Sequence, residues 1–204
     1  MADDAVLDAL AAGSVVVLPT DTVYGLVVVA AHPGATARLF DLKGRDASVP
    51  IAVLCADAEQ ALALVHPDDG GRHELRAVAE RWWPGPLTLV ARRRTGLDLQ
   101  LGRPEHTIGL RVPDDDRIRA LAQRLGPLAA TSANRHGEPT VTSAAEATEV
   151  FGTEVAAIVD GGDLGDRAST VIDTTTWPWR VLRKGPLDAD SVVATGAAAR
   201  AAEG

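Results

Sequence analysis

The chain is poor in cysteine and in aromatic residues. Cys55 is the single cysteine among 204 residues, so neither an internal disulfide nor a cysteine-rich zinc site can form. Phe, Trp and Tyr together make up 3% of the sequence, so Val, Leu, Ala and Ile must fill the core. The sequence therefore predicts an aliphatic core and a reducing compartment, which we take to be the cytoplasm.

Long apolar runs and an excess of positive charge are also missing. No apolar run approaches the ~20 residues of a membrane span, and the acidic start Met1-Ala2-Asp3-Asp4 lacks the basic residues of a signal peptide. The formal net charge of −8 argues against a general nucleic-acid or anionic-membrane surface, because phosphate binding needs a basic face. A small basic pocket is still compatible with this charge.

Several catalytic signatures are absent. The sequence has no G-x-x-x-x-G-K-[ST] loop, no G-x-G-x-x-G after a strand, no G-x-S-x-G elbow and no H-E-x-x-H. The five histidines are scattered among turns and helix starts, so we predict no metal site from them. The sequence therefore does not indicate any of the enzyme classes that carry these motifs.

The sequence does contain short apolar strands that interleave irregularly with amphipathic helices. We expect strands at 14–18, 25–31, 50–55, 87–90, 108–112, 127–130, 155–159, 170–173 and 179–182. We expect helices at about 3–12, capped by Asp3 or Asp4, and at 33–42, 57–65, 72–83, 114–125, 143–151 and from 188 onward. This order predicts an α/β (α+β type) fold, a single layered domain with a mixed β-sheet flanked by helices. The domain would span residues 1–204, with its core at about 13–187 and a C-terminal tail at about 188–204.

Hydroxyl and amide side chains gather where the apolar strands end. In PTDTVYGL (residues 19–26), Pro19 stops one strand and Gly25 permits the turn into the next. The segment TSAN (residues 131–134) follows another strand, and Ser169 precedes a third. Each segment alone could be a turn or a helix cap. In an open α/β sheet, however, the crevice at the strand ends is where small ligands bind.

Cationic residues also lie at the ends of elements. Lys43 and Arg45 follow a helix, and residues i and i+2 of an extended segment face the same way, so this pair could grip one phosphate chain. Alternation along IGLRVP places Arg111 on the face opposite to its apolar neighbours, and Arg183 closes a strand in a similar way. Any one of them could equally be a solvated or salt-bridged surface residue. Each of these signals is weak by itself. The occurrence of these cations together with the hydroxyl clusters, in this order along the chain, is what indicates a function.

The order of PTDTVYGL, KGRxxxxP, WPGPLTLV, IGLRVP, TSAN, STVID and LRKG resembles the YrdC-like family, the threonylcarbamoyl-adenylate synthases, over residues 13–187. The chain is similar to the short, single-domain form of that family. The resemblance implies a strongly twisted mixed sheet with a concave, locally basic cavity. It implies that L-threonine, bicarbonate and ATP give L-threonylcarbamoyl-AMP and pyrophosphate. Other proteins would then transfer the threonylcarbamoyl group to adenosine 37 of tRNAs that read ANN codons, and weak contact with tRNA is compatible with this role.

The resemblance also implies a role for each matching residue. Thr22, Arg111 and Ser169 match positions that hold L-threonine, with Arg111 pairing with its carboxylate. The ATP side is matched by Lys43, Arg45, Thr107, Ser132, Asn134, Thr140 and Arg183. Lys43 and Arg45 are the predicted catalytic residues, since they would neutralise charge on the phosphates together with Mg²⁺ bound through those phosphates. No residue is assigned as a metal ligand or as a general base.

The sequence departs from the family pattern after K-x-R. Val49 and Leu54 stand where the family often has Asn and His, and Asp46 replaces a common proline. Some polar contacts to nucleotide and threonine are therefore expected to be missing or supplied elsewhere.

Other functions remain open from the sequence. The first is a module that binds double-stranded RNA or tRNA without chemistry, with Lys43, Arg45 and Arg92–Arg94 as its basic face. The second is a related enzyme that makes carbamoyl-adenylate from carbamoyl phosphate. Its relatives carry zinc-finger and acylphosphatase-like regions, for which one cysteine and 204 residues leave no room. A free-standing domain that senses threonine is a third.

Overall fold

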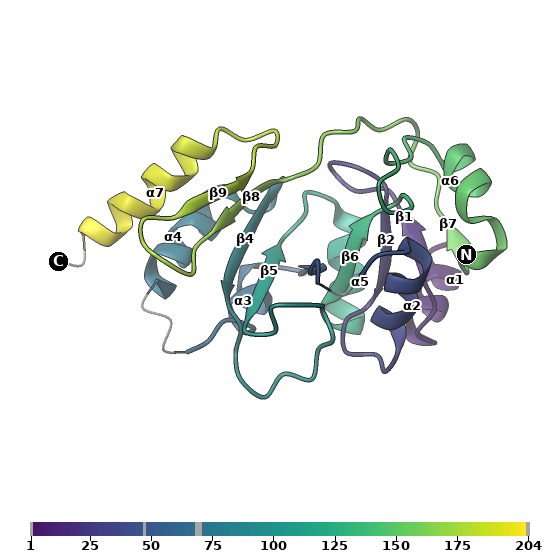
Figure 1. Ribbon diagram of the computed structural model, residues 1–204, viewed down its shortest axis with the longest axis horizontal. Helices are drawn as coiled ribbons and strands as arrows, with labels where there is room; N and C mark the ends of the chain where they lie inside the picture. Colours follow the sequence, from purple (N-terminus) through teal and green to yellow (C-terminus); the bar gives the residue numbers. More distant parts are fainter. Residues whose placement is uncertain (1, 47, 68–70, 203–204) are drawn as a thin grey trace.

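A nine-stranded sheet organises the chain in the computed structural model, which describes residues 2–46, 48–67 and 71–202 (Figure 1). The strands are β1 (Val16–Leu18), β2 (Gly25–Val29), β3 (Ala52–Leu54), β4 (Leu87–Arg92), β5 (Thr107–Arg111), β6 (Leu128–Ser132), β7 (Ala157–Ile158), β8 (Thr170–Asp173) and β9 (Arg180–Arg183). Their order is β7-β1-β2-β6-β3-β5-β4-β8-β9. The β1–β7, β3–β5 and β4–β8 pairs are parallel and the other neighbours antiparallel, so the predicted mixed sheet is confirmed.

Helices lie where the sequence predicts them, with ends that differ by a few residues. They are α1 (Ala2–Ala11), α2 (Ala35–Lys43), α3 (Ala58–Leu62), α4 (Arg72–Trp82), α5 (Asp116–Leu125), α6 (Ala144–Phe151) and α7 (Ala189–Ala201), with a 3₁₀ turn at Gly152–Glu154. The side chains of Asp115 and Ser143 accept from the backbone N–H groups of Ile118 and Glu146, which caps α5 and α6. The predicted cap of the first helix is wrong, because α1 already begins at Ala2 and Asp4 lies inside its first turn.

The predicted C-terminal tail is mostly the helix α7, which lies along α4 at one end of the sheet (Figure 1). Val192 on this helix is fully buried in the core. Gly196 packs against the Trp179 ring so closely that an added Cβ would come within 2.5 Å of it. The ordered structure therefore extends beyond the predicted core limit at residue 187.

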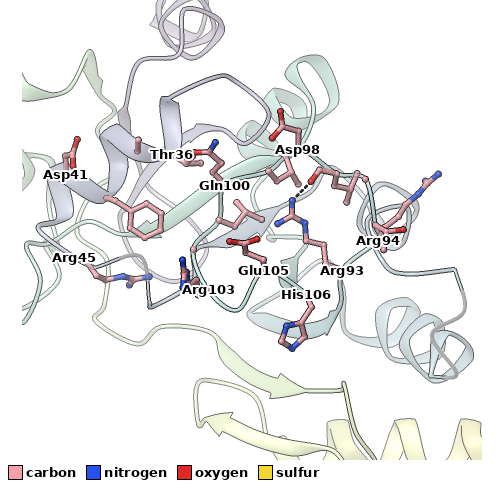
Figure 2. A pocket seen from close by; sticks show the side chains of 18 residues that line it. Thr36, Asp41, Arg45, Arg93, Arg94, Asp98, Gln100, Arg103, Glu105 and His106 are labelled. Atoms are coloured by element: carbon pink, nitrogen blue, oxygen red, sulfur yellow. Dashed lines mark hydrogen bonds between the residues drawn. The ribbon is translucent and has the colours of Figure 1, made fainter.

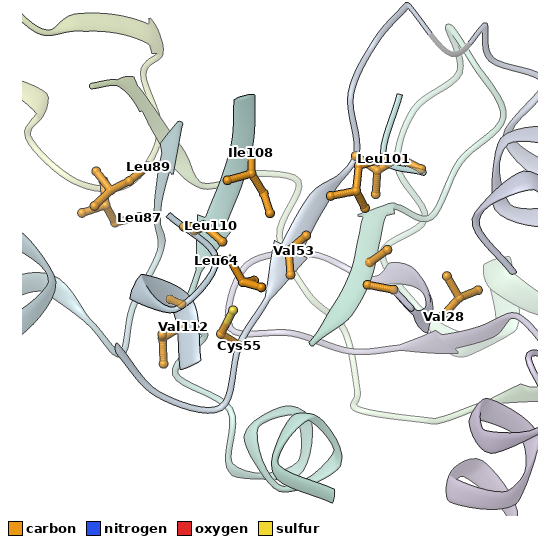
Figure 3. Packing of buried hydrophobic residues seen from close by; sticks show 14 of the residues in the cluster. Val28, Val53, Cys55, Leu64, Leu87, Leu89, Leu101, Ile108, Leu110 and Val112 are labelled. Atoms are coloured by element: carbon orange, nitrogen blue, oxygen red, sulfur yellow. The ribbon is translucent and has the colours of Figure 1, made fainter. Parts of the chain in front are cut away.

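The two faces of the sheet are covered unequally. Side chains of α2, α3, α4, α6 and α7 join the larger apolar core on one face, where Val53, Leu89 and Leu110 are buried among other aliphatic residues (Figure 3). On the other face, α1 and α5 pack against β1, β2, β3 and β6 through residues such as Leu10 and Ile118. The remainder of this second face is open and holds the site described below. In the described part of the chain, no helix has both the length and the apolar character of a membrane span.

Strand alternation places polar side chains on the open face. Along β5, Ile108 and Leu110 enter the larger core, while Thr107, Gly109 and Arg111 line a hollow on the opposite face. The orientation predicted for Arg111 is thus confirmed. Because the side-chain period of a strand is two, the same apolar residues that fix the core fix the direction of Arg111.

Candidate active site

The open face of the sheet forms a hollow of about 340 Å³, here called the cavity. Its polar lining residues are Thr20, Thr22, Arg45, Thr88, Thr107, Arg111, Thr131, Ser132, Ser169 and Arg183. Among the described residues that line it there is no carboxylate, and every charged one is an arginine. In a chain of net charge −8, this is a local concentration of positive potential, and it suits an anionic ligand.

Arg111 is fixed at one end of the cavity by three neighbours. Its Nε donates to the Gly85 carbonyl at 3.2 Å and its Nη1 to Thr22 Oγ1 at 3.0 Å. Its Nη2 forms an ion pair with Asp21. Thr22 Oγ1 lies in turn 3.0 Å from Thr20 Oγ1. The guanidinium is therefore held in one orientation, as recognition of a carboxylate by Arg requires.

Arg183 and Ser169 form a second polar group beside Arg111. The Nε of Arg183 donates to the Ser169 carbonyl at 2.8 Å, and its Nη2 donates to Ser169 Oγ at 3.0 Å. Ser169 Oγ also lies 2.8 Å from Thr88 Oγ1. Burial, and then the nearby charge of Arg111, lower the pKa of Arg183. The two guanidinium groups are therefore close enough to repel each other across the cavity.

Arg45 lies on the segment between α2 and β3. Its Nη2 donates to the carbonyls of Val49 at 2.6 Å and Pro50 at 2.8 Å. Its Nε is buried and makes no hydrogen bond in the described structure. Burial lowers the pKa of this guanidinium. Arg45 thus faces the cavity with carbonyl partners and without a bonded carboxylate, which leaves its charge available to a ligand.

Lys43 lies behind the cavity lining. It is 3% exposed, and its Nζ donates to the Ser132 carbonyl at 2.6 Å, to Ser132 Oγ at 3.1 Å and to Asn134 Oδ1. Burial, with a smaller effect of the Arg45 charge, lowers the pKa of Lys43 to about 8. Because an ammonium has three N–H donors, these contacts use all of them. Lys43 therefore reaches the cavity through Ser132.

The structure brings most of the predicted site residues to one cavity. Thr22, Arg45, Thr107, Arg111, Ser132, Ser169 and Arg183 line it. Lys43, Asn134 and Thr140 are not among its described lining residues. Asn134, like Ser132, accepts a hydrogen bond from the Lys43 ammonium. The Nδ2 of Asn134 donates to the carbonyls of Arg135 and Glu138. In this arrangement the Lys43 ammonium bonds to Ser132 and Asn134, and its direct contact with phosphates stays a prediction.

Sequence reasoning missed four polar residues of the site. Thr20 and Asp21 lie inside PTDTVYGL and Thr131 lies inside TSAN, but they received no role, although their motifs were singled out. Thr88 alternates with the core residues Leu87 and Leu89, so its orientation could have been read from the sequence.

The two positions that depart from the family pattern both line the cavity. They are Val49 and Leu54. Leu54 pairs in register with Arg111 across β3 and β5, so an aliphatic wall lies beside that guanidinium.

A larger hollow of about 860 Å³ lies between α2 and the β4–β5 connection (Figure 2). Of the residues described for the two hollows, Arg45 is common to both. Arg93, Arg94 and Arg103 also line it, but the carboxylates of Asp41, Asp98 and Glu105 are interspersed with them. This hollow has mixed charge, and the other predicted site residues lie outside its lining.

Comparison with known proteins assigns the family. The Sua5/YciO/YrdC family model, which carries the description "telomere recombination", matches residues 8–185. The chain belongs to this family. It is 37% identical over 186 residues to a putative threonylcarbamoyl-AMP synthase of Mycobacterium tuberculosis, covering 90% of this chain and 84% of that protein. It is 37% identical over 187 residues to the Pyrococcus abyssi threonylcarbamoyl-AMP synthase, covering 88% of this chain and 53% of that one.

Solved structures of family members superpose closely. The structure of P. abyssi Sua5 complexed with L-threonine matches with a TM-score of 0.86 and 34% identity over 95% of this chain and 56% of that one. Escherichia coli YciO matches with a TM-score of 0.79 and 26% identity over 91% of this chain and 90% of that one. Full-length HypF in a phosphate- and nucleotide-bound form is 21% identical with a TM-score of 0.74, which shows a shared fold alone. The family and the twisted mixed sheet predicted from the sequence are confirmed, while the chain spans about half of the longer relatives.

Proposed function

We propose that this chain is a threonylcarbamoyl-AMP synthase, which converts L-threonine, bicarbonate and ATP to L-threonylcarbamoyladenylate and pyrophosphate. The observation that carries the proposal is the cavity itself, in which Arg45, Arg111 and Arg183 meet a set of hydroxyl groups without a lining carboxylate among the described residues. Relatives of that name at 37% identity and the relative solved with L-threonine support it.

L-Threonine is assigned to the part of the cavity that contains Arg111. The fixed guanidinium of Arg111 would take the substrate carboxylate. The hydroxyls of Thr22, bonded to Arg111, and of Ser169, bonded to Arg183, line the same cavity and would orient the rest of the molecule. Leu54 provides an apolar wall beside that guanidinium. This arrangement recognises a small α-amino acid by charge and by hydroxyl contacts.

ATP is assigned to the part of the cavity that contains Arg45. Arg45 and Arg183 supply positive charge for the phosphates, and Ser132 supplies a hydroxyl whose position Lys43 fixes. Thr107 lies at the opposite end of β5 from Arg111, and so extends the nucleotide side away from the amino acid. Asn134 and Thr140 are assigned to the nucleotide by the resemblance, since they lie behind or outside the described lining.

The chemistry joins the two ligands. The amine of threonine and bicarbonate give a carbamate and water, and exclusion of water by the bound substrates would protect this unstable group. A carbamate oxygen then bonds to the α-phosphorus of ATP, the bond from that phosphorus to the bridging oxygen breaks, and pyrophosphate leaves with its electron pair. Arg45 stabilises the charge that develops on the phosphates, and Lys43 contributes by holding Ser132.

Mg²⁺ enters this proposal with the ATP substrate. Carboxylate and water oxygens are the ligands that Mg²⁺ prefers. The described cavity lining has no carboxylate, and in the described part of the chain no cluster of three or more His, Cys, Asp or Glu side chains could hold a metal ion. The residues present do not fit a resident magnesium site, and no step is assigned to one.

Measurement of pyrophosphate release tests the proposal. We expect release to require L-threonine, bicarbonate and ATP together, with the adduct of threonine, carboxyl carbon and AMP detected by mass spectrometry. Equal release in the absence of threonine would contradict it. Replacement of threonine and bicarbonate by carbamoyl phosphate distinguishes the carbamoyl-adenylate alternative, which predicts turnover with that substrate.

An RNA-binding module without chemistry is less compatible with the geometry. Lys43 is buried, so it cannot belong to an exposed basic face, and Arg93 and Arg94 share their hollow with carboxylates. Tight binding of RNA that weakens steeply with salt, in the absence of ATP turnover, would favour that module. For the synthase, we propose that separate proteins carry the product to tRNA.

A further inference from the structure

We propose that Asp21 is a positioning residue, which holds the Arg111 guanidinium in the orientation that binds the substrate carboxylate and offsets the repulsion between Arg111 and Arg183. The identity of the substrate rests on the proposed function; the hold of Asp21 on Arg111 does not.

The carboxylate of Asp21 approaches Arg111 from behind the cavity. Oδ1 of Asp21 pairs with Nη2 of Arg111, and the two side chains are 10% and 8% exposed. Asp21 is absent from the described lining of the cavity, whereas Arg111 belongs to it. A substrate carboxylate and the Asp21 carboxylate would therefore lie on different sides of the same guanidinium.

The donors of Arg111 divide between the protein and a ligand. Nε is used by the Gly85 carbonyl, one N–H of Nη1 by Thr22 Oγ1, and one N–H of Nη2 by Asp21. A guanidinium carries one N–H on Nε and two on each Nη, so one N–H on each Nη is left. A carboxylate can bond to two N–H groups of one guanidinium in a bidentate pair, so the two that are left would suffice for the substrate carboxylate. Asp21 thus holds Nη2 in place, while one N–H on each Nη is left for a ligand.

Asp21 also supplies a needed negative charge. Burial, and to a smaller extent the positive charge of Arg111, lowers the pKa of Arg183, as expected for two guanidinium groups that line the same cavity. Among the described contacts of the three arginines that line the cavity, Asp21 is the carboxylate partner. Without it, the buried charge of Arg111 would lack an opposite charge.

The stability of the fold does not by itself explain why an aspartate stands at position 21. Oδ2 of Asp21 is buried and has no hydrogen-bond partner in the described structure, which is unfavourable for a carboxylate oxygen. A local cost that is retained beside a ligand-binding guanidinium is expected of functional sites. We attribute the presence of Asp21 at this position to its hold on the orientation of Arg111.

Substitution of Asp21 by Asn tests the proposal, because Asn keeps the shape and one acceptor but removes the charge. We expect D21N to raise KM for L-threonine by about ten- to a hundred-fold, since a misplaced binding group can cost about a hundred-fold. KM for ATP should change by less than about twofold, because the binding interaction that is weakened involves L-threonine and not ATP. The preference for L-threonine over L-threonine amide should fall, because Arg111 no longer presents a fixed fork.

Asp173→Asn is the matched control. Asp173 is another buried carboxylate that pairs with an arginine, Arg180, at 2.7 Å, but it lies outside the described lining of the cavity. D173N should leave both KM values and the preference for threonine over its amide unchanged. An equal change in D21N and D173N, or a D21N variant with unaltered KM for L-threonine, would overturn the proposal.

A second measurement does not depend on activity. In ¹H–¹⁵N spectra of arginine side chains, the Nη2 protons of Arg111, one of which bonds to Asp21, should exchange slowly in the wild-type protein, with the Nη protons of Arg94 as an exposed reference, and should exchange faster in D21N. Fast exchange of Arg111 in the wild type would overturn the proposal even if D21N does not fold. If exchange is slow in the wild type and faster in D21N, but the wild type releases no pyrophosphate with threonine, the proposed function fails while Asp21 keeps its role on Arg111.

Discussion

The ammonium of Lys43 lies 3.1 Å from the hydroxyl of Ser132, the residue that separates it from the cavity. The contact ties the C-terminal end of α2 to the end of β6. Two bonds to backbone carbonyls of α2 strengthen this tie: the backbone N–H of His136 donates to the Lys43 carbonyl at 2.7 Å, and the side-chain Nη1 of Arg135 donates to the Leu42 carbonyl at 2.6 Å. Lys43 therefore influences the nucleotide side of the cavity by placing Ser132.

Titration of Lys43 should make stability depend on pH. Burial lowers its pKa from 10.5 to about 8, so the folded protein releases this proton at a lower pH than the unfolded chain does. In that range the unfolded state binds more protons, so the contribution of Lys43 to the free energy of unfolding rises with pH from about 8 to 10.5 and is flat below. Urea denaturation across this range should show the rise in the wild type and lose it in Lys43→Met. The same slope in both proteins would contradict the assignment.

Arg45→Ala should slow the reaction more than it destabilises the fold. Arg45 lines the cavity and bonds to carbonyls of its own segment, so its loss removes charge at the phosphates and leaves the sheet intact. By analogy with lost oxyanion donors, we expect kcat to fall by about 10²–10³. Initial rates of pyrophosphate release measure this. Arg124→Ala, an exposed arginine in the last turn of α5, is the control and should retain full rate.

Gly109 keeps the centre of the cavity open. An added Cβ would meet Thr88 Cγ2 at 3.5 Å and Ala52 at 3.8 Å, which are ordinary contacts, so Gly109→Ala should fold normally. The branched side chain of Gly109→Val would extend into the hollow that Gly109 lines. Because these added atoms would occupy ligand space rather than core space, we expect ligand affinity to fall by about ten-fold or more, which is ~1.4 kcal/mol, while the melting temperature is maintained. Calorimetric titration and thermal unfolding of both variants separate these effects; unchanged affinity in Gly109→Val would place the ligand elsewhere.

Cys55 should be chemically inert in the folded protein. Its side chain is fully buried, and burial, with a smaller effect of the Asp57 charge, raises the pKa of its thiol to about 12. Because the thiolate is the reactive form, a thiol reagent at pH 8 should label it at the rate of unfolding. In denaturant one thiol per chain should react at once. Fast labelling without denaturant would show that the core opens locally around β3.

Much of the fold was predictable because hydrophobic periodicity reports burial directly. The side on which Arg111 emerges from β5 follows from the burial of Ile108 and Leu110, and the cap of α6 follows from Ser143 and Glu146. The end of the ordered structure was harder to predict, since α7 is held by packing of Gly196 on Trp179 and by burial of Val192. Such contacts leave little trace in a local pattern.

The sequence by itself determined the strands and helices, the face of each that is buried, and the polar residues placed at the strand ends. These properties depend on neighbours a few positions apart. Only the tertiary structure decided that Arg111 meets Asp21, 90 positions away, and that Lys43 turns behind Ser132, 89 positions away, rather than into the cavity. The physical reason is that contacts of such long range depend on strand order and register, which bring the residues within hydrogen-bonding distance after the sheet has assembled.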